Sequence, residues 1–203
     1  RVRGPPGPTL FPYPTLFRSL DNEPADNLAA LADAKGTKVT DLVVCMLDRP
    51  RHGEMIAKIR DAGARIRLIL DGDVSGVISA TQFDAGVDLF LGIGGAPQGV
   101  LAAAALRGVG GQMQGRPICR NDDDRADAGN VGIEDMERKY SADEMASGNV
   151  TFAATGITYS TMLNGVRHIP GGAITHSMIW RSVTGTLRYV EGHHDFARWP
   201  AKL

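Results

Sequence analysis

Charged residues and glycines follow three apolar runs of this sequence, at the point where each run ends. The three segments are Asp48-Arg49-Pro50-Arg51-His52, Asp71-Gly72-Asp73 and the stretch 92–98, which reads GIGGAPQ. Arginine suits phosphate because its guanidinium fork makes bidentate, charge-assisted hydrogen bonds. Aspartate suits sugar hydroxyls or Mg²⁺. The combination predicts a site for a phosphorylated polyol.

The glycine-rich stretch adds a second means of binding phosphate. Val87–Leu91 has the apolar composition of a buried strand, and Pro97–Leu106 that of a helix with proline in its first turn. The small residues between them allow a tight turn. Backbone N–H groups converge where such a turn enters a helix, and the helix dipole adds partial positive charge. The same pattern also fits a tight βα turn that holds no ligand, so the loop alone does not establish a phosphate site.

Each polar residue also has an alternative structural role. Arg49 and Arg51 could be solvent-exposed or paired with Asp48. The Asp71-Gly72-Asp73 segment could cap a helix, since its residues are good capping and turn residues. His52 could be an ordinary first-turn residue. The joint occurrence of these segments at three neighbouring strand ends favours the functional interpretation.

The polar segments belong to an alternation of strands and helices. The sequence predicts strands at Leu42–Leu47, Arg65–Leu70 and Val87–Leu91, and helices at Asp26–Ala34, Arg51–Ala62, Asp73–Ala80 and Pro97–Leu106. Asp26 is a candidate N-cap of the first helix, and Gly63 ends the second. This order predicts βαβ units in a mostly parallel sheet. Ligands of such sheets bind beyond the carboxyl ends of the strands, where the three segments lie.

The second half of the chain is predicted to be β-rich. Gly115–Ser147 is charged and reads as a surface connector with one or two small helices. A strand is predicted at Asn149–Thr155, and Ala173–Ser182 with Thr186–Glu191 predict an antiparallel hairpin. These strands would form one continuous sheet with the first half or a second, adjoining sheet. The histidines here lack ligand spacing and are expected to be structural or surface groups: His176, His193 and His194.

Composition excludes several classes of function. The 203 residues are 43% hydrophobic and 22% charged, with a net charge of −1, which gives no support to binding of nucleic acid or of a membrane surface. No apolar run reaches the ~20 residues of a membrane helix. Cys45 and Cys119 have no metal-ligand spacing, and Cys45 is expected to be a buried apolar residue. This use of cysteine favours the cytoplasm.

The start of the chain differs from the rest. Arg1–Ser19 contains five prolines and no periodicity, and the composition changes at Leu20. We expect residues 1–20 to be a non-native or disordered start that packs on nothing, with a natural proline-rich arm as the alternative. Residues 21–203 then form the domain.

From residue 21 onward the chain resembles the class II fructose-1,6-bisphosphatases of bacteria. The resemblance is carried, in order, by Asp48–His52, Asp71–Asp73, Gly92–Val100, Gly110–Arg116, Met145–Gly148, Phe152–Thr158 and Gly172–Ser177. It implies an α/β fold, the layered α/β sandwich of the lithium-sensitive sugar phosphatases, with a β-rich C-terminal part. It also implies a phosphoric monoester hydrolase that cleaves the 1-phosphate of fructose 1,6-bisphosphate to give fructose 6-phosphate, with Mn²⁺ or Mg²⁺.

The resemblance assigns roles to individual residues and a setting to the protein. Arg49 and Arg51 would hold a substrate phosphate, Asp71 and Asp73 would bind sugar hydroxyls, and Gly95 would contact substrate through its backbone. Pro50 and Gly72 lie within the same binding segments. Sedoheptulose 1,7-bisphosphate is a second candidate substrate. The family implies gluconeogenesis and glycerol metabolism in the cytoplasm, a homo-oligomer when intact, and no nucleic-acid or membrane partner.

Two departures from the family pattern affect this interpretation. Gln98 occupies the position of a glutamate that ligates metal in the family, and a carboxamide offers one neutral oxygen without charge. The family's N-terminal half, with most carboxylate ligands and the catalytic threonine, has no counterpart here, so the chain is interpreted as a C-terminal, inactive fragment. A non-catalytic sugar-phosphate-binding module is the alternative. A nucleotide-binding Rossmann domain fits poorly, because residues 92–97 lack the third glycine of that motif.

Overall fold

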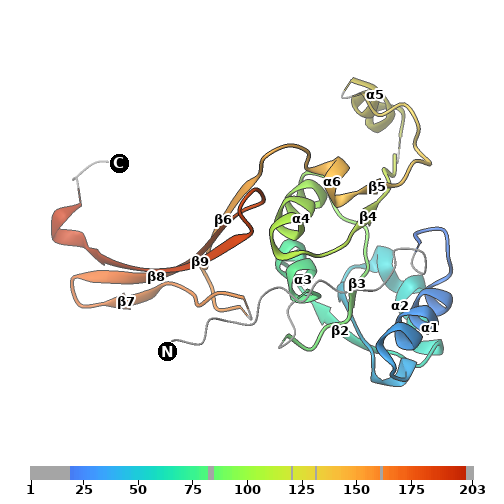
Figure 1. Cartoon of the computed structure of the whole chain (residues 1–203), viewed down its shortest axis with the longest axis horizontal. Helices are drawn as coiled ribbons and strands as arrows, with labels where there is room; N and C mark the ends of the chain where they lie inside the picture. Colours follow the sequence, from blue (N-terminus) through green and yellow to red (C-terminus); the bar gives the residue numbers. More distant parts are fainter. Residues whose placement is uncertain (1–18, 82–84, 120, 131, 161, 200–203) are drawn as a thin grey trace.

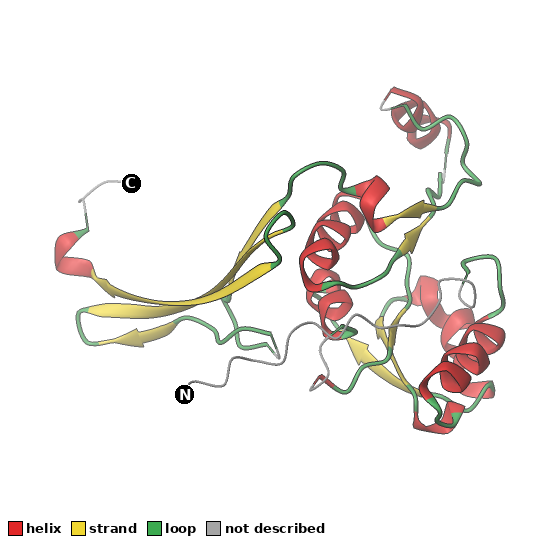
Figure 2. Cartoon of the chain, viewed as in Figure 1, coloured by secondary structure: helices red, strands yellow, loops and turns green. Residues whose placement is uncertain are grey.

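Helices and short strands gather in one part of the molecule, and long strands form the other (Figure 2). The chain is thus a mixed α/β protein, as predicted. The computed structural model describes residues 19–81, 85–119, 121–130, 132–160 and 162–199. None of its described helices is long and apolar enough to cross a membrane.

A three-stranded parallel sheet forms the first layer. Its order is β2-β1-β3, with β1 at Val43–Leu47, β2 at Arg65–Ile69 and β3 at Leu89–Phe90. The apolar run of β1 is central because it is buried from both sides. These strands confirm the predicted parallel sheet, although β3 is shorter than the predicted Val87–Leu91.

Helices cover both faces of this sheet (Figure 1). On one face, α1 (Pro24–Lys35) and α2 (Gly53–Asp61) pack on β1 through a shared apolar core. On the other face lies α3 (Asp73–Ser79), where a Cβ added at Gly76 would fall 2.9 Å from Phe90 of β3. Glycine therefore allows the close approach of helix and sheet. The short 3₁₀ turns η2 (Val39–Asp41) and η3 (Pro50–His52) flank β1.

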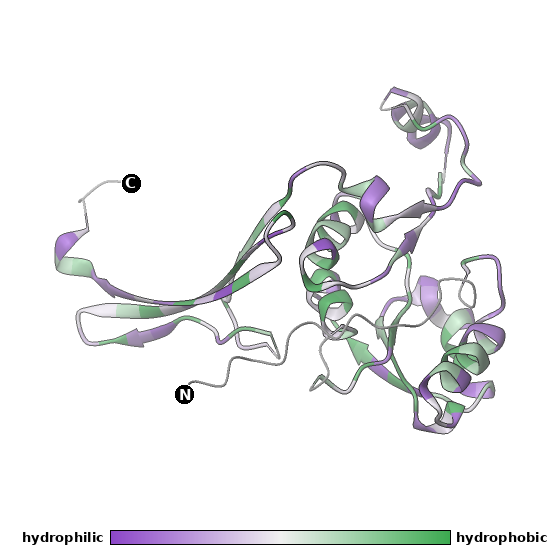
Figure 3. Ribbon diagram, viewed as in Figure 1, coloured by the Kyte–Doolittle hydropathy of each residue, from purple (hydrophilic) through white to green (hydrophobic). Residues whose placement is uncertain are grey.

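Helix α4 (Ala96–Val109) joins this layer to the rest of the molecule. Its apolar residues make it hydrophobic around most of its circumference (Figure 3). Ala102 and Leu106 pack with α3, Ala103 packs with the following connector, and Ala105 packs with the C-terminal sheet. A helix that is buried on several sides needs small side chains, which the alanine run supplies.

The connector after α4 is a surface excursion, as predicted. It contains a two-stranded antiparallel ribbon of β4 (Gln114–Gly115) and β5 (Tyr140–Ser141), the hydrophilic helix α5 and the single-turn helix α6. The helices span Asp122–Asn130 and Ala142–Met145, and α5 has no buried residue. Arg107 of α4 forms an ion pair with Asp143, which ties α6 to the core.

The C-terminal part is a separate, antiparallel sheet of four strands. Strand β8 (Gly172–Arg181) pairs with β6 (Thr151–Thr155), β7 (Arg167–Ile169) and β9 (Thr186–Asp195), and η5 (Phe196–Arg198) follows. The predicted hairpin is confirmed as β8–β9. The sequence did not predict β7, whose three residues are all exposed.

An aromatic pair of the C-terminal sheet lies in the apolar cluster that joins this sheet to α4. Trp180 of β8 is 0% exposed and stacks on Phe152 of β6, with ring centroids 5.6 Å apart and an interplanar angle of 18°. Gly108 of α4 faces this pair, and a Cβ added there would overlap the ring of Trp180. The absence of a side chain at Gly108 therefore lets the indole lie against the helix backbone.

The structure corrects the predicted start of the domain. The prediction for Arg1–Ser19 falls outside the described residues except at Ser19, and there it is wrong. Ser19 exchanges hydrogen bonds of 3.0 and 2.9 Å with the side chain of Asn27, and the backbone N–H of Leu20 donates to Gln114 at 3.3 Å. Residues 19 and 20 thus belong to the folded body.

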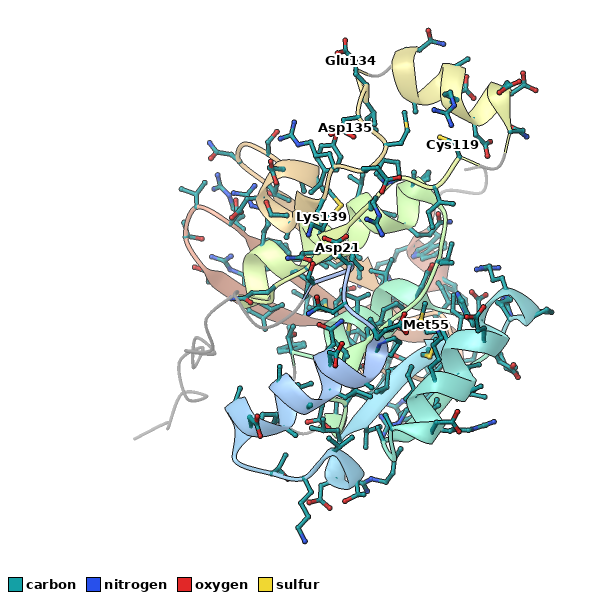
Figure 4. All side chains as sticks on the ribbon, turned by 90° about the vertical axis from the view of Figure 1, so that its right-hand side faces the viewer. Asp21, Met55, Cys119, Glu134, Asp135 and Lys139 are labelled. Atoms are coloured by element: carbon teal, nitrogen blue, oxygen red, sulfur yellow. The ribbon has the colours of Figure 1, made fainter. Side chains whose placement is uncertain are left out.

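Asp21 joins this start to the connector. Its carboxylate forms ion pairs with Lys139, which lies beside it in Figure 4, and with Arg116. The hydrogen bond from Lys139 and the pairing with Arg116 hold the pKa of Asp21 below its ordinary value.

The predicted N-cap of α1 is also wrong: Glu23 is the N-cap residue, because Pro24 starts the helix two residues earlier and places Asp26 in the first turn.

We predict that Gly108→Ala destabilises the chain by about 1–3 kcal/mol, because the new methyl group overlaps a ring that has no space to move. The intrinsic helix propensity would favour alanine by about 1 kcal/mol, so the clash reverses the usual sign. Urea unfolding of both proteins measures the difference. Gly99→Ala in the same helix is the matched control, because a Cβ at Gly99 has open space around it; a stabilised Gly108→Ala would contradict the prediction.

We also predict a pH-dependent contribution from Glu144 to the stability of α6. The backbone N–H of Ser141, the guanidinium of Arg138 and the Ser141 hydroxyl lower the pKa of Glu144 from its ordinary 4.5 to about 2. The contribution is therefore complete above pH ~4.5 and lost as the pH falls toward ~2. The melting-temperature difference between the wild type and Glu144→Gln should shrink across that range.

The control for this comparison is Glu134→Gln, whose side chain points away from the body of the protein in Figure 4. It should change the melting temperature by the same small amount at every pH. A Glu144→Gln difference that stays constant between pH 5 and pH 2 would show that the capping interaction does not contribute in this way.

Candidate functional site

The strand order places a topological switch point at the carboxyl ends of β1 and β3. The chain passes from β1 to β2 on one side and returns to β3 on the other, which is the switch point where open α/β sheets bind ligands. The segments Arg49–His52 and 92–95 follow these two strands, and Asp71–Asp73 follows β2. The three polar segments therefore do share one edge of the sheet.

Two hydrogen bonds connect the residues after β1 to the glycine loop, and they hold the backbone N–H and C=O of one residue, Ile93. Arg51 Nε donates to the carbonyl oxygen of Ile93 at 2.8 Å, and the backbone N–H of Ile93 donates to His52 Nε2 at 2.9 Å. His52 is 0% exposed, and its Nδ1 lies 2.8 Å from the carbonyl oxygen of Leu47 at the end of β1. The glycine loop is thereby fixed to the first strand end.

The two arginines are not paired with Asp48 in the described structure. Arg49 is half-buried and donates from Nη1 to the backbone carbonyl of Asp48 at 3.0 Å. Arg51 is exposed, and within the described ranges its Nη groups have no hydrogen-bond partner. The salt-bridge alternative is therefore not what the structure shows, and the Arg51 fork is free to bind an anion.

The two aspartates lie where β2 enters α3. Asp71 accepts a hydrogen bond from the N–H of Gly72 at 2.8 Å, and Asp73 accepts one from the N–H of Val74 at 3.1 Å. The N-cap residue is Gly72, at a φ of 82°, and no side chain caps this helix. The capping alternative is thus wrong in detail. Asp73 also reaches the glycine loop, since a Cβ added at Gly94 would lie 3.2 Å from Oδ2.

Helix α4 begins at the glycine loop with its N-terminal amides uncapped by a side chain. Gly95 is the N-cap residue and Pro97 lies in the first turn, as the sequence predicts. The carboxamide of Gln98 folds back over Gly95, and a Cβ added at Gly95 would overlap it. Uncapped N–H groups at the start of a 14-residue helix suit an anion, and a side chain at position 95 would displace the Gln98 carboxamide.

A metal ion is implied by the family resemblance, but the described residues do not fit one. No group of three or more His, Cys, Asp or Glu side chains in the described part of the chain could hold an ion. Gln98 would supply a single neutral oxygen.

Cys45 is a buried core residue, as the sequence predicts. Burial raises the pKa of its thiol.

A cavity in the C-terminal part lies away from this edge. It has a volume of about 550 Å³ and is lined by the C-terminal sheet and the loop before β7, including Tyr159, Arg167, His176 and Glu191. The Nδ1 atom of His176 is buried there without a hydrogen-bond partner among the described residues. None of the residues at the switch point lines it. His193 forms a hydrogen bond with Glu191, and His194 forms one with Thr175. These contacts match the structural role predicted for both histidines.

The sequence analysis did not predict that His52 connects two strand ends. It was expected as a first-turn helix residue, whereas η3 turns its ring into the protein between two strand ends. The available signal was its position: a histidine directly after Pro50-Arg51, at the end of a buried strand, can reach the neighbouring strand end.

Known proteins are similar to this chain over most of its length. A family profile described as "Bacterial fructose-1,6-bisphosphatase, glpX-encoded" matches residues 17–194. Three curated relatives all carry the name "D-fructose 1,6-bisphosphatase class 2/sedoheptulose 1,7-bisphosphatase".

The relative from Trichodesmium erythraeum (strain IMS101) is 40% identical over 190 residues, covering 87% of this chain and 55% of the relative. The Microcystis aeruginosa (strain NIES-843 / IAM M-2473) protein is 40% identical over 192 residues, covering 88% and 56%. The Synechococcus sp. (strain JA-3-3Ab) protein is 41% identical over 190 residues, covering 86% and 54%. The chain thus spans about half the length of these relatives. Since the profile covers most of the chain, the chain belongs to the bacterial, glpX-encoded fructose-1,6-bisphosphatase family.

Proposed function

We propose that the intact protein is a phosphoric monoester hydrolase that converts fructose 1,6-bisphosphate to fructose 6-phosphate and phosphate in gluconeogenesis. The observation that carries this proposal is the meeting of Arg51, Asp73 and the glycine loop at the β1/β3 switch point. The relatives' shared name adds sedoheptulose 1,7-bisphosphate as a second substrate.

The residues of this chain would bind and orient the sugar bisphosphate. The guanidinium groups of Arg49 and Arg51 would hold a phosphate, as charge-assisted forks do. Asp71 and Asp73 would accept hydrogen bonds from sugar hydroxyls, and the backbone of Gly95 would contact the substrate at the start of α4. Pro50 and Gly72 shape the turns that carry these groups.

The hydrolytic chemistry would need groups beyond the described residues. A divalent ion, Mn²⁺ or Mg²⁺, would polarise the phosphoryl group when bound. Its carboxylate ligands would come from outside the part of the protein described, with Gln98 as a weak contributor at the edge of the site.

The fold type, the oligomeric state and the cellular location are part of the same proposal. Residues 21–203 would be the C-terminal portion of a layered sandwich of the lithium-sensitive sugar phosphatase type. The intact protein would be a homo-oligomer in the cytoplasm, with a role in glycerol metabolism as well.

A non-catalytic sugar-phosphate-binding module is the second candidate. It is favoured by one observation: the described residues contain the groups for phosphate and sugar binding but no cluster that could hold a metal ion. Binding and phosphate release therefore have to be measured separately.

We predict that the 203-residue chain binds fructose 1,6-bisphosphate and releases no measurable phosphate from it with Mn²⁺ or Mg²⁺. Isothermal titration measures the binding, and a phosphate assay measures the release. The intact protein should do both; an intact protein that binds without releasing phosphate would favour the binding module. Robust release by the chain alone would show that it holds a complete catalytic site.

We further predict that Arg51→Ala weakens fructose 1,6-bisphosphate binding by roughly ten- to a hundredfold, since a charge-assisted phosphate contact contributes about 1.5–3 kcal/mol. Arg51→Lys should restore only part of the affinity, because a point charge cannot form the fork. Titration and thermal melting of the same proteins give the two quantities. Arg60→Ala, an exposed arginine of α2, controls for the change of net charge. A large fall in melting temperature with unchanged affinity would assign Arg51 a structural role instead.

A further inference from the structure

The buried imidazole of His52 links two strand ends that are distant in the sequence. Its Nδ1 lies 2.8 Å from the carbonyl oxygen of Leu47 in β1, and its Nε2 lies 2.9 Å from the backbone nitrogen of Ile93 in the glycine loop. The side chain is 0% exposed. Water therefore does not compete for either ring nitrogen.

The two partners determine the tautomer of the ring. A carbonyl oxygen can only accept a hydrogen bond, so Nδ1 must carry the proton that is donated to Leu47. A backbone N–H can only donate, so Nε2 must present its lone pair to Ile93. His52 is therefore a neutral imidazole protonated at Nδ1, and no other protonation state makes both hydrogen bonds.

The backbone N–H and the carbonyl oxygen of Ile93 are held by consecutive residues. His52 accepts from the N–H of Ile93, while Arg51 donates to its carbonyl oxygen at 2.8 Å. The neighbours Gly92, Gly94 and Gly95 have no side chains to restrict the loop, and glycine has the largest conformational freedom of any residue. The clamp on Ile93 therefore fixes a loop that its own sequence leaves free.

This fixed loop leads directly into the start of α4. One residue, Gly94, separates Ile93 from the N-cap residue Gly95, so a displacement of the Ile93 backbone would move the backbone of Gly95. The same displacement would disturb Arg51, whose Nε is bonded to that peptide. Phosphate binding by the arginine and by the loop is thus coupled through the backbone of one residue, Ile93.

We propose that His52 is the positioning residue of the sugar-phosphate site: its Nδ1-protonated ring holds the Ile93 peptide so that the loop and the Arg51 fork face the same ligand. This inference rests on the proposed function in taking a sugar bisphosphate as the ligand. His52 itself does not touch that ligand, because it is buried beneath the loop.

Two substitutions each keep one of the two hydrogen bonds of the ring and remove the other. The amide nitrogen of His52→Asn can replace Nδ1 and donate to Leu47, but the side chain is too short to reach Ile93. The amide oxygen of His52→Gln can replace Nε2 and accept from Ile93, but the donor to Leu47 is lost. Each variant buries one polar group without its former partner, so the two serve as matched controls for folding.

The experiment is NMR spectroscopy of the 203-residue chain, with fructose 1,6-bisphosphate as the added ligand. Long-range ¹H–¹⁵N spectra of the wild type should show Nδ1 protonated and Nε2 unprotonated. His52→Asn should speed amide exchange at Ile93 by roughly five- to a hundredfold and weaken ligand binding by about tenfold, whereas His52→Gln should keep both near the wild-type values. The melting temperatures of the two variants should fall by similar amounts.

Three results would overturn the proposal. The first is a ring protonated at Nε2. The second is ligand affinity and Ile93 exchange in His52→Asn equal to those of the wild type, and the third is a loss of affinity that follows melting temperature in both variants. If the wild type binds no fructose 1,6-bisphosphate, the proposed function fails for this chain. The tautomer and the Ile93 exchange then still decide whether His52 positions the loop.

Discussion

The burial of α4 on several sides is the constraint on which the arrangement of this molecule depends. The helix packs against α3, the connector and the C-terminal sheet through separate faces. Only small residues allow three neighbours to approach one helix so closely, and alanines occupy these faces, while Gly108 receives the ring of Trp180. Much of the stability of such a junction comes from exact packing, because interiors at this density cannot absorb an added methyl group without strain.

The same helix connects packing to function. Its N-terminus follows the glycine loop at the β1/β3 switch point, so whatever positions α4 also positions the amides that begin at Gly95. The loop before it is held from the other side by the residues after β1. The candidate site is thus formed between a helix fixed by the core and a turn fixed by hydrogen bonds, an arrangement that pre-organises backbone groups for a ligand.

The sequence predicted well what depends on local pattern. The apolar run of β1, the alternation of strands with helices and the polar segments after three strands are all visible in the residues, and the parallel sheet brings those segments together as expected. It predicted poorly what depends on distant partners. Strand β7 is short and exposed and exists through pairing with β8, and the inward turn of His52 depends on a carbonyl and an amide in two other segments. The attachment of Ser19 to Asn27 and Lys139 likewise could not be read from a proline-rich start.

The environments of the two tryptophans give the protein a built-in optical reporter. Trp180 is 0% exposed in the junction with α4, while Trp199 is 49% exposed beyond η5. A buried indole emits at shorter wavelength than a hydrated one, so the two residues contribute separable components to the fluorescence spectrum. With only two tryptophans in the chain, replacing Trp199 by phenylalanine would leave a single emitter that senses whether the C-terminal sheet is docked on α4. Separation of the C-terminal sheet from α4 is then followed by fluorescence, independently of any change at the β1/β3 switch point.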